Sequence, residues 1–138
     1  MKLTRRDTLL AAGGAAIVAG LPMRAMAAAD EAIAEFTGGA TPGEGGITLT
    51  APEIAENGNT VPIEVDAPGA AEIRVYADGN PTPAVATFMF GPLAAEQMAS
   101  TRIRLAGTQD VVAIAKMPDG SFVQARQEVK VTIGGCGG

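Results

Sequence analysis

Apolar and polar residues alternate along most of the chain between residues 47 and 133, and this pattern constrains the fold more than any other feature. Val61, Ile63 and Val65, for example, are separated from one another by single proline or acidic residues. A period of two places every second side chain on the same face of a pleated strand, whereas a helix would scatter these residues around its axis. The region is therefore predicted to form strands that are buried on one face.

Seven segments carry this alternation or a continuous apolar run. The residues expected to face inward are Ile47 and Leu49; Val61, Ile63 and Val65; Ile73, Val75 and Ala77; Ala86, Phe88 and Phe90; Ile103 and Leu105; the run 111–117; and Val123, Ala125, Val129, Val131 and Ile133. Arg74 and Tyr76 are expected to face the other way, and residues 91–100 to form a helical turn or an irregular crossover. Turn sequences rich in Asn, Gly, Pro and Asp separate the segments. Short strands at such spacing predict an all-β fold, an immunoglobulin-like antiparallel β-sandwich over residues 47–133.

A different pattern precedes the strands. Residues 28–36 have a helix-forming composition with Ala32, Ile33 and Phe36 on one side, and residues 37–46 contain five glycines. Residues 28–46 are therefore predicted to form a short N-terminal helix and a Gly-rich linker.

Residues 1–27 have the organisation of an export signal. Basic residues including Arg5 and Arg6 precede an uncharged run over residues 9–21, and small residues around Ala27 suit cleavage after that position. The run is too short for a membrane-spanning helix, which needs about 20 apolar residues. The Arg5-Arg6 pair resembles a twin-arginine signal, with an ordinary secretory signal as the alternative. Both alternatives predict an exported protein without a membrane anchor, and the first predicts folding before export.

Composition excludes several kinds of function. The chain has no His and one Cys, so it has no His-based catalytic pair, no His-ligated metal and no internal disulfide. We therefore expect no metal and no cofactor. The net charge of -5 argues against nucleic-acid binding. Without residues 1–27 the balance becomes six basic against 14 acidic side chains, which favours solubility and attraction to basic partner surfaces.

The chemistry of the chain is concentrated in its last five residues, Gly134, Gly135, Cys136, Gly137 and Gly138. Four glycines lose much conformational entropy when they are ordered, so these residues are predicted to form a flexible arm. Three extended residues beyond a strand ending at Ile133 would carry Cys136 about 10 Å from the body. An exposed thiol with an ordinary pKa of about 8.5 is mostly protonated at neutral pH. Cys136 therefore suits a covalent attachment point better than an autonomous nucleophile.

Other interpretations of this ending stay open at the level of the residues. An unpaired cysteine in an exported protein could form a disulfide-linked dimer through Cys136, which would make the chain a binding or structural module. Gly137 and Gly138 could instead be activated at the terminal carboxylate, as in ubiquitin-like sulfur carriers, although that activation is cytoplasmic. An enzyme is the weakest interpretation, because the two serines, Ser100 and Ser121, lack a nucleophile motif.

The ending formed by residues 131–138, on an exported β-rich domain, closely resembles the SoxY family, the sulfur-carrying subunits of bacterial thiosulfate-oxidising systems. The resemblance implies that Cys136 is the covalent attachment site and that the protein is a non-catalytic carrier in the periplasm. It also implies a heterodimer with a SoxZ-like subunit. The other partners implied are a SoxAX-like c-type cytochrome that loads the cysteine, a SoxB-like hydrolase that releases sulfate, and a SoxCD-like sulfur dehydrogenase.

Overall fold

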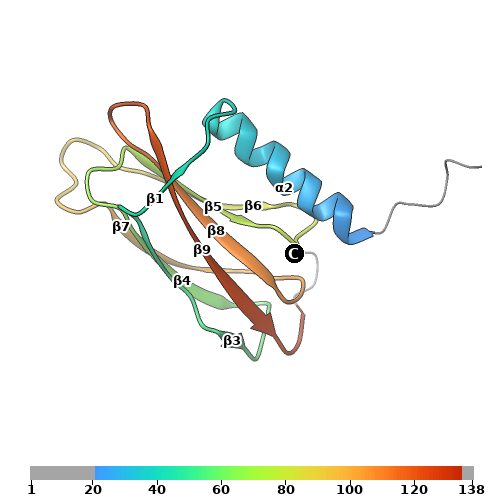
Figure 1. Ribbon diagram of the computed structural model, residues 1–138. Helices are drawn as coiled ribbons and strands as arrows, with labels where there is room; N and C mark the ends of the chain where they lie inside the picture. Colours follow the sequence, from blue (N-terminus) through green and yellow to red (C-terminus); the bar gives the residue numbers. More distant parts are fainter. Residues whose placement is uncertain (1–20, 135–138) are drawn as a thin grey trace, which may run out of the picture.

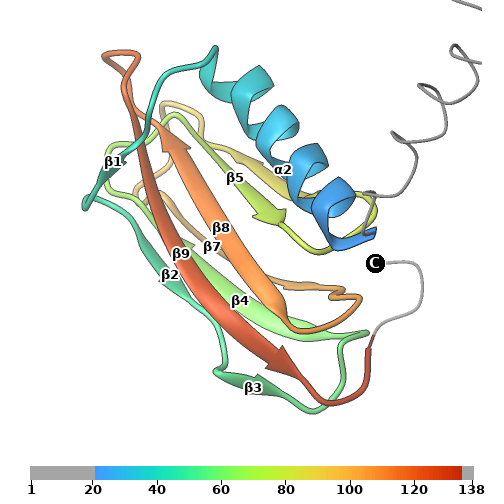
Figure 2. The same ribbon diagram turned by 45° about the vertical axis from the view of Figure 1, so that its right-hand side comes forward.

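The computed structural model describes the backbone of residues 21–134 and the side chains of residues 27–134. Two β-sheets pack face to face, and helix α2 (Leu21–Thr37) lies across the outer face of the larger sheet (Figures 1 and 2). The described part of the chain thus forms three layers, α2 and the two sheets. The prediction of an all-β sandwich with a short N-terminal helix is confirmed.

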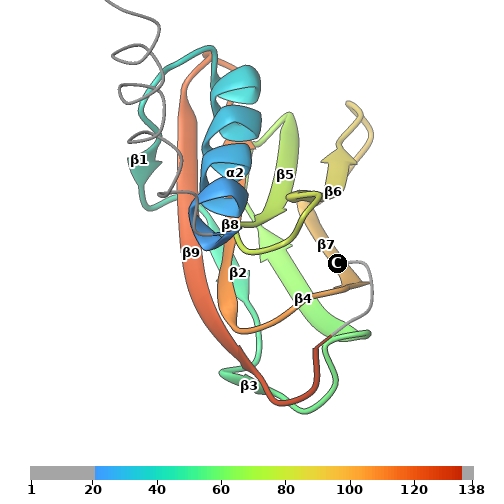
Figure 3. The same cartoon turned by 90° about the vertical axis from the view of Figure 1, so that its right-hand side faces the viewer.

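The larger sheet has the order β1-β9-β8-β5-β6, with β3 also paired to β9, and the smaller sheet has the order β2-β4-β7. The strands are β1 (Gly43–Glu44), β2 (Thr48–Thr50), β3 (Ile54–Ala55), β4 (Val61–Asp66), β5 (Glu72–Ala77), β6 (Ala84–Met89), β7 (Met98–Ile103), β8 (Gln109–Lys116) and β9 (Phe122–Val131). The longer strands pair in antiparallel fashion, while the two-residue strands β1 and β3 run parallel to β9. Figure 3 shows the edge strands β6 and β7 on the same side of the sandwich.

The core between the sheets consists of the alternating residues that the sequence pattern predicts. In β4, Val61, Ile63 and Val65 are at most 3% exposed. Val75 of β5 and Val111 of β8 are fully buried against them in one cluster. Burial of apolar side chains stabilises a fold by about 25 cal/mol per Å², so this layer holds the two sheets together.

A second, smaller cluster lies on the opposite face of the larger sheet, beneath α2. It contains Tyr76, Val112 and Ile114, and Ile33 and Phe36 of α2 pack on it. Tyr76 faces away from the core between the sheets, as expected, but the helix covers this face and leaves Tyr76 only 2% exposed. Both faces of β5 and β8 are therefore buried, and strict alternation of apolar and polar residues fails there.

The helix is longer than the sequence pattern predicts. Among the described residues it spans Leu21–Thr37, so it is already present seven residues before the expected start. It ends at Thr37, because Gly38 has a left-handed φ of 65° and Gly39 N donates to Ala34 O over 3.2 Å. This is a Schellman-type ending, for which glycine is the usual residue. The helix thus runs across the expected cleavage position after Ala27, and the export signal stays a prediction.

The strand boundaries also differ at three places. The expected linker over residues 37–46 contains β1, and residues 91–100 contribute the first residues of β7. At the other end, β9 ends at Val131, and Ile133 is 66% exposed, although it was expected to face the core. The chain therefore leaves the sheet two residues earlier than predicted.

Candidate functional site

The candidate site is the place where the chain leaves β9, which we call the arm root and define as residues 132–134. Of the predicted site residues, Gly134 belongs to it and is exposed. Gly135, Cys136, Gly137 and Gly138 lie outside the described residues, as do Arg5 and Arg6 of the predicted signal. The structure therefore defines the attachment of the predicted arm to the body.

Backbone hydrogen bonds fix the first part of the arm root. Thr132 N donates to Ala55 O over 3.0 Å, which continues the pairing of β3 with β9 beyond the end of the strand. Ile133 O accepts a hydrogen bond from Gly58 N over 2.7 Å, although the Ile133 side chain is exposed. The backbone of Ile133 is thus held although its side chain contributes little to the core.

The bond from Gly58 connects the arm root to the smaller sheet. Gly58 O accepts a hydrogen bond from Leu105 N over 2.8 Å, so Gly58 lies between Ile133 and Leu105. Leu105 is fully buried and follows β7. Through this bridge, the arm root is joined to both sheets of the sandwich.

Gly134 is packed closely against the loop between β7 and β8. A Cβ atom added to Gly134 would overlap the carbonyl oxygen of Ala106. Gly107, the next residue in that loop, has open space around the same position. The glycine at position 134 is therefore required by a close backbone approach, whereas the sequence pattern attributed it to flexibility alone.

A buried polar network holds the loop on which Gly134 packs. Asn80 is fully buried; its Nδ2 donates to Arg104 O over 2.8 Å, and its Oδ1 accepts from Ala106 N over 2.9 Å and from Gln109 Nε2 over 2.8 Å. Gln109, 7% exposed, also accepts from Gly79 N over 2.8 Å through its Oε1. Buried polar groups that find all their partners make a loop rigid. This network fixes residues 104–109 and, through Ala106, the position of Gly134.

This network was not predicted from the sequence. Residues 78–81 belong to one of the predicted turns, and Gln109 precedes the apolar run of β8 without a distinguishing pattern. The available signal was one Asn between a Gly and a Pro, which is typical of turns in general. Pairing Asn80 with Gln109 requires knowledge that the β5–β6 and β7–β8 loops lie at the same end of the sandwich.

Two further features of the described residues concern metal binding and membrane insertion. Within residues 27–134, no group of three or more His, Cys, Asp or Glu side chains could hold a metal ion. No helix in the part of the chain that the structure describes is long and apolar enough to cross a membrane. The arm root can position the backbone of residues that follow Gly134.

The chain was compared with known protein families, curated proteins and solved structures. The family model described as sulfur oxidation protein SoxY matches residues 33–136. No curated protein matches.

Among solved structures, the sulfur carrier protein SoxY from Chlorobium limicola f thiosulfatophilum is 36% identical, covers 78% of this chain and 94% of its own, and has a TM-score of 0.68. The superoxide reductase neelaredoxin from Ignicoccus hospitalis is 21% identical, covers 63% of this chain and 80% of its own, and has a TM-score of 0.55. A putative superoxide reductase from Thermotoga maritima is 18% identical, covers 70% of this chain and 89% of its own, and has a TM-score of 0.53. At these identities the two reductases share the fold alone.

Proposed function

This chain belongs to the SoxY family of sulfur oxidation proteins, and on that premise we propose that it is a periplasmic carrier that holds thiosulfate-derived sulfur covalently on Cys136. The observation that supports this function best is the arm root itself. The chain is tied to both sheets up to Gly134, and the cysteine follows two residues later. We infer that the body anchors the arm and that partner enzymes reach the thiol beyond it.

Loading of the carrier is an oxidation. The thiol of Cys136 and thiosulfate lose two electrons and one proton, and the new bond joins the cysteine sulfur to the sulfane sulfur of thiosulfate. The product is a cysteine S-thiosulfonate, Cys–S–S–SO₃⁻. The electrons pass to a SoxAX-like c-type cytochrome, since the sequence has neither His nor a second Cys for a redox centre of its own.

Release of sulfate is a hydrolysis. Water attacks the terminal sulfone sulfur, the S–S bond next to it breaks, and the products are sulfate, a persulfide anion on Cys136 (Cys–S–S⁻) and two protons. A SoxB-like hydrolase would supply this step, and a SoxCD-like sulfur dehydrogenase would oxidise the remaining sulfane sulfur. This division of labour assigns the catalytic groups to the partner enzymes and the covalent attachment to Cys136.

The proposal includes an export pathway and a permanent partner subunit. The Arg5-Arg6 pair would direct export by the twin-arginine pathway, which accepts folded proteins and would allow a SoxZ-like subunit to be exported in complex with this chain. Cleavage after Ala27 would leave the acidic mature form. The Gly134–Gly138 arm would then reach the catalytic sites of the other enzymes.

The test is reconstitution with the partner enzymes and thiosulfate, comparing the wild-type chain with Cys136→Ser. The wild-type chain is expected to gain the mass of one thiosulfate and to support sulfate release, while the variant is expected to do neither. The Ser121→Ala variant is a matched control, because Ser121 lies in an exposed turn and should load normally. Sulfate production that survives in Cys136→Ser would refute the proposal. So would a wild-type chain that yields only a reductant-sensitive dimer.

A further inference from the structure

Two arginines project from the smaller sheet at the end next to the arm root. Arg102 lies in β7 and Arg104 directly follows it, and both are exposed, whereas Ile103 and Leu105 between and beyond them are buried in the core. The alternation places both guanidinium groups on the outer face of the sandwich. No carboxylate among the described residues forms an ion pair with either of them. They form a pair of positive charges, which we call the arginine pair.

The arginine pair lies close to the arm root. Gly58 is hydrogen-bonded both to Ile133 and to Leu105, the residue after Arg104. Two residues along the chain from Gly58, the Thr60 hydroxyl lies 3.4 Å from Arg102 Nη1. The loop that leads into β4 is thus a bridge with the arm root on one side and Arg102 on the other.

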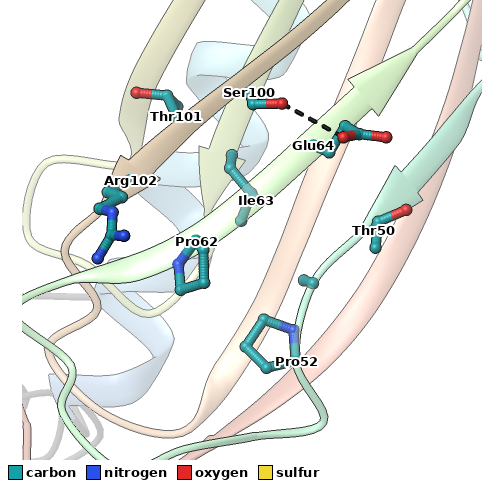
Figure 4. Close-up of a pocket in the computed structure, with 9 residues that line it drawn as sticks. Thr50, Pro52, Pro62, Ile63, Glu64, Ser100, Thr101 and Arg102 are labelled. Carbon is teal, nitrogen blue, oxygen red and sulfur yellow. Dashed lines mark hydrogen bonds between the residues drawn. The ribbon is translucent and has the colours of Figure 1, made fainter.

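A groove begins at Arg102 and follows the outer face of the smaller sheet. It has a volume of about 590 Å³, and Pro52 and Pro62 form an apolar part of its lining. Figure 4 shows Arg102 beside Pro62 at one end, and the hydrogen bond from Ser100 to Glu64 farther along. The groove is therefore positive at the end near the arm root and negative farther away.

The chain continues beyond Gly134 with the residue proposed to carry the sulfur adduct. Cys136 is two residues from Gly134, which extended backbone can carry about 7 Å, and its side chain with an attached sulfur group extends farther. An arm that turned back past Thr60 would direct the attached group toward Arg102, because the Gly58–Thr60 segment contacts both the arm root and Arg102. Sulfonate oxygens accept charge-assisted hydrogen bonds from guanidinium groups, and the bridging sulfur atoms suit an apolar wall.

We propose that the arginine pair and the adjoining end of the groove bind the anionic sulfur adduct on Cys136 when the carrier is between enzymes. This inference rests on the proposed carrier function and adds to it a receptor for the cargo, specific for an S-thiosulfonate or another sulfonate. The occupant is the chain's own segment 135–138 with its adduct. Because the arginines are exposed, the bound form is favoured only about two- to fivefold, which shields the adduct and still lets a partner enzyme withdraw it.

The adduct for the test can be made without partner enzymes. Tetrathionate reacts with the thiolate of Cys136, which attacks one of the two inner sulfur atoms; thiosulfate leaves, and the S-thiosulfonate stays on the protein. Iodoacetamide gives a neutral adduct at the same atom as a control. Intact mass verifies each adduct first, so failure to load would count against the proposed function, while the binding measurements below concern the arginine pair alone.

Two measurements test the binding. In NMR spectra, the anionic adduct should shift the side-chain Nε–Hε signals of Arg102 and Arg104 and the amides near Thr60, and the neutral adduct should not. In kinetics, dithiothreitol, which attacks the adduct through its thiolate, should remove the adduct about two- to fivefold faster from Arg102→Ala/Arg104→Ala than from the wild type. High salt should abolish this difference, because exposed charges are screened.

Lys116→Ala is the matched control, since it removes one positive charge at the other end of β8, opposite the first residue of β9. It should release the adduct at the wild-type rate. Equal release rates for the wild type and the double arginine variant, or arginine shifts that are the same with both adducts, would overturn the inference even if Cys136 loads normally.

Discussion

Gly134 shows how one residue can have two structural roles that the sequence does not separate. It was predicted as part of a flexible arm, and the structure shows its backbone against the carbonyl of Ala106. The absence of a side chain therefore allows the arm root to lie close to the β7–β8 loop. Flexibility of the arm is a prediction that concerns the residues beyond it.

Replacing Gly134 by alanine should lower the free energy of unfolding by about 1 kcal/mol. This is the low end of the cost of inserting a methyl group into a packed site, because the backbone near the end of the chain can shift to relieve the overlap. Gly107→Ala is the control, since a Cβ atom there has open space in the same loop. Urea unfolding measures both variants. A Gly134→Ala protein as stable as the wild type, with unchanged amide signals at Ala106, would contradict the close approach.

Tyr76 is a single residue whose ionisation makes the stability of the fold depend on pH. Burial under α2 raises its pKa above the ordinary value of 10.0, and contact with Arg74 offsets part of this effect. The neutral phenol is thus favoured in the folded state. The stability that this provides is complete below pH 10 and is lost as the pH rises through the folded-state pKa.

Tyr76 is the single tyrosine and the chain has no tryptophan, so absorbance of the phenolate reports on this residue directly. The midpoint of its titration in the folded protein should lie above 10. Thermal unfolding should show a stability loss above pH 10 that is smaller in Tyr76→Phe. A midpoint at or below the ordinary value would mean that the helix does not cover this ring.

At the scale of elements, the loops at the arm end depend on one buried side chain. Asn80 connects the β5–β6 loop to the β7–β8 loop through hydrogen bonds to Arg104, Ala106 and Gln109. Removing it would leave several of these groups buried without partners, and each such group costs about 1–3 kcal/mol.

Asn80→Ala should therefore lower the free energy of unfolding by about 3 kcal/mol and speed hydrogen exchange at the Ala106 amide. Asn57→Ala is the comparison, because Asn57 is exposed and its side chain accepts one hydrogen bond, from Asn59 N. That variant should stay within about 0.5 kcal/mol of the wild type. Similar stabilities for the two variants would show that the network does not hold the loops.

The strands could be predicted from the sequence wherever one face of a sheet is buried and the other is exposed. This is the case in β4, whose Val61, Ile63 and Val65 alternate with less buried residues. The pattern fails in β5, where Tyr76 is buried beneath a helix on the opposite face. The two-residue strands β1 and β3 could not be predicted, because two residues show no period and their pairing with β9 is set by tertiary structure.

The sequence predicts the reactive residue of the candidate site, but it does not predict the residues that hold the arm root in place. Cys136 and its glycines are adjacent in sequence, so composition alone reveals them. The groups that hold the arm root come from far along the chain, including Gly58, Asn80 and Ala106. Their meeting at one end of the sandwich follows from the strand order, which the pattern of apolar residues does not define.

For the whole molecule, the three layers place the arm root at one end of the sandwich, where Gly58 links it to both sheets. The other end carries the β8–β9 turn and exposed apolar side chains such as Met89 and Leu93, which are 76% and 98% exposed. If the adduct is attached through the arm at one end of the sandwich, the remaining surface stays available to partner subunits. This arrangement agrees with a protein whose function is to present an attached group to other proteins.

The most direct test of the account is the intact mass of the chain isolated under non-reducing conditions from cells oxidising thiosulfate, followed by mapping of the modified residue. The account predicts adducts of thiosulfate or sulfane sulfur on Cys136 that disappear on reduction, on a chain that begins after Ala27. An unmodified thiol throughout turnover, or sulfur found only on the terminal carboxylate of Gly138, would contradict it.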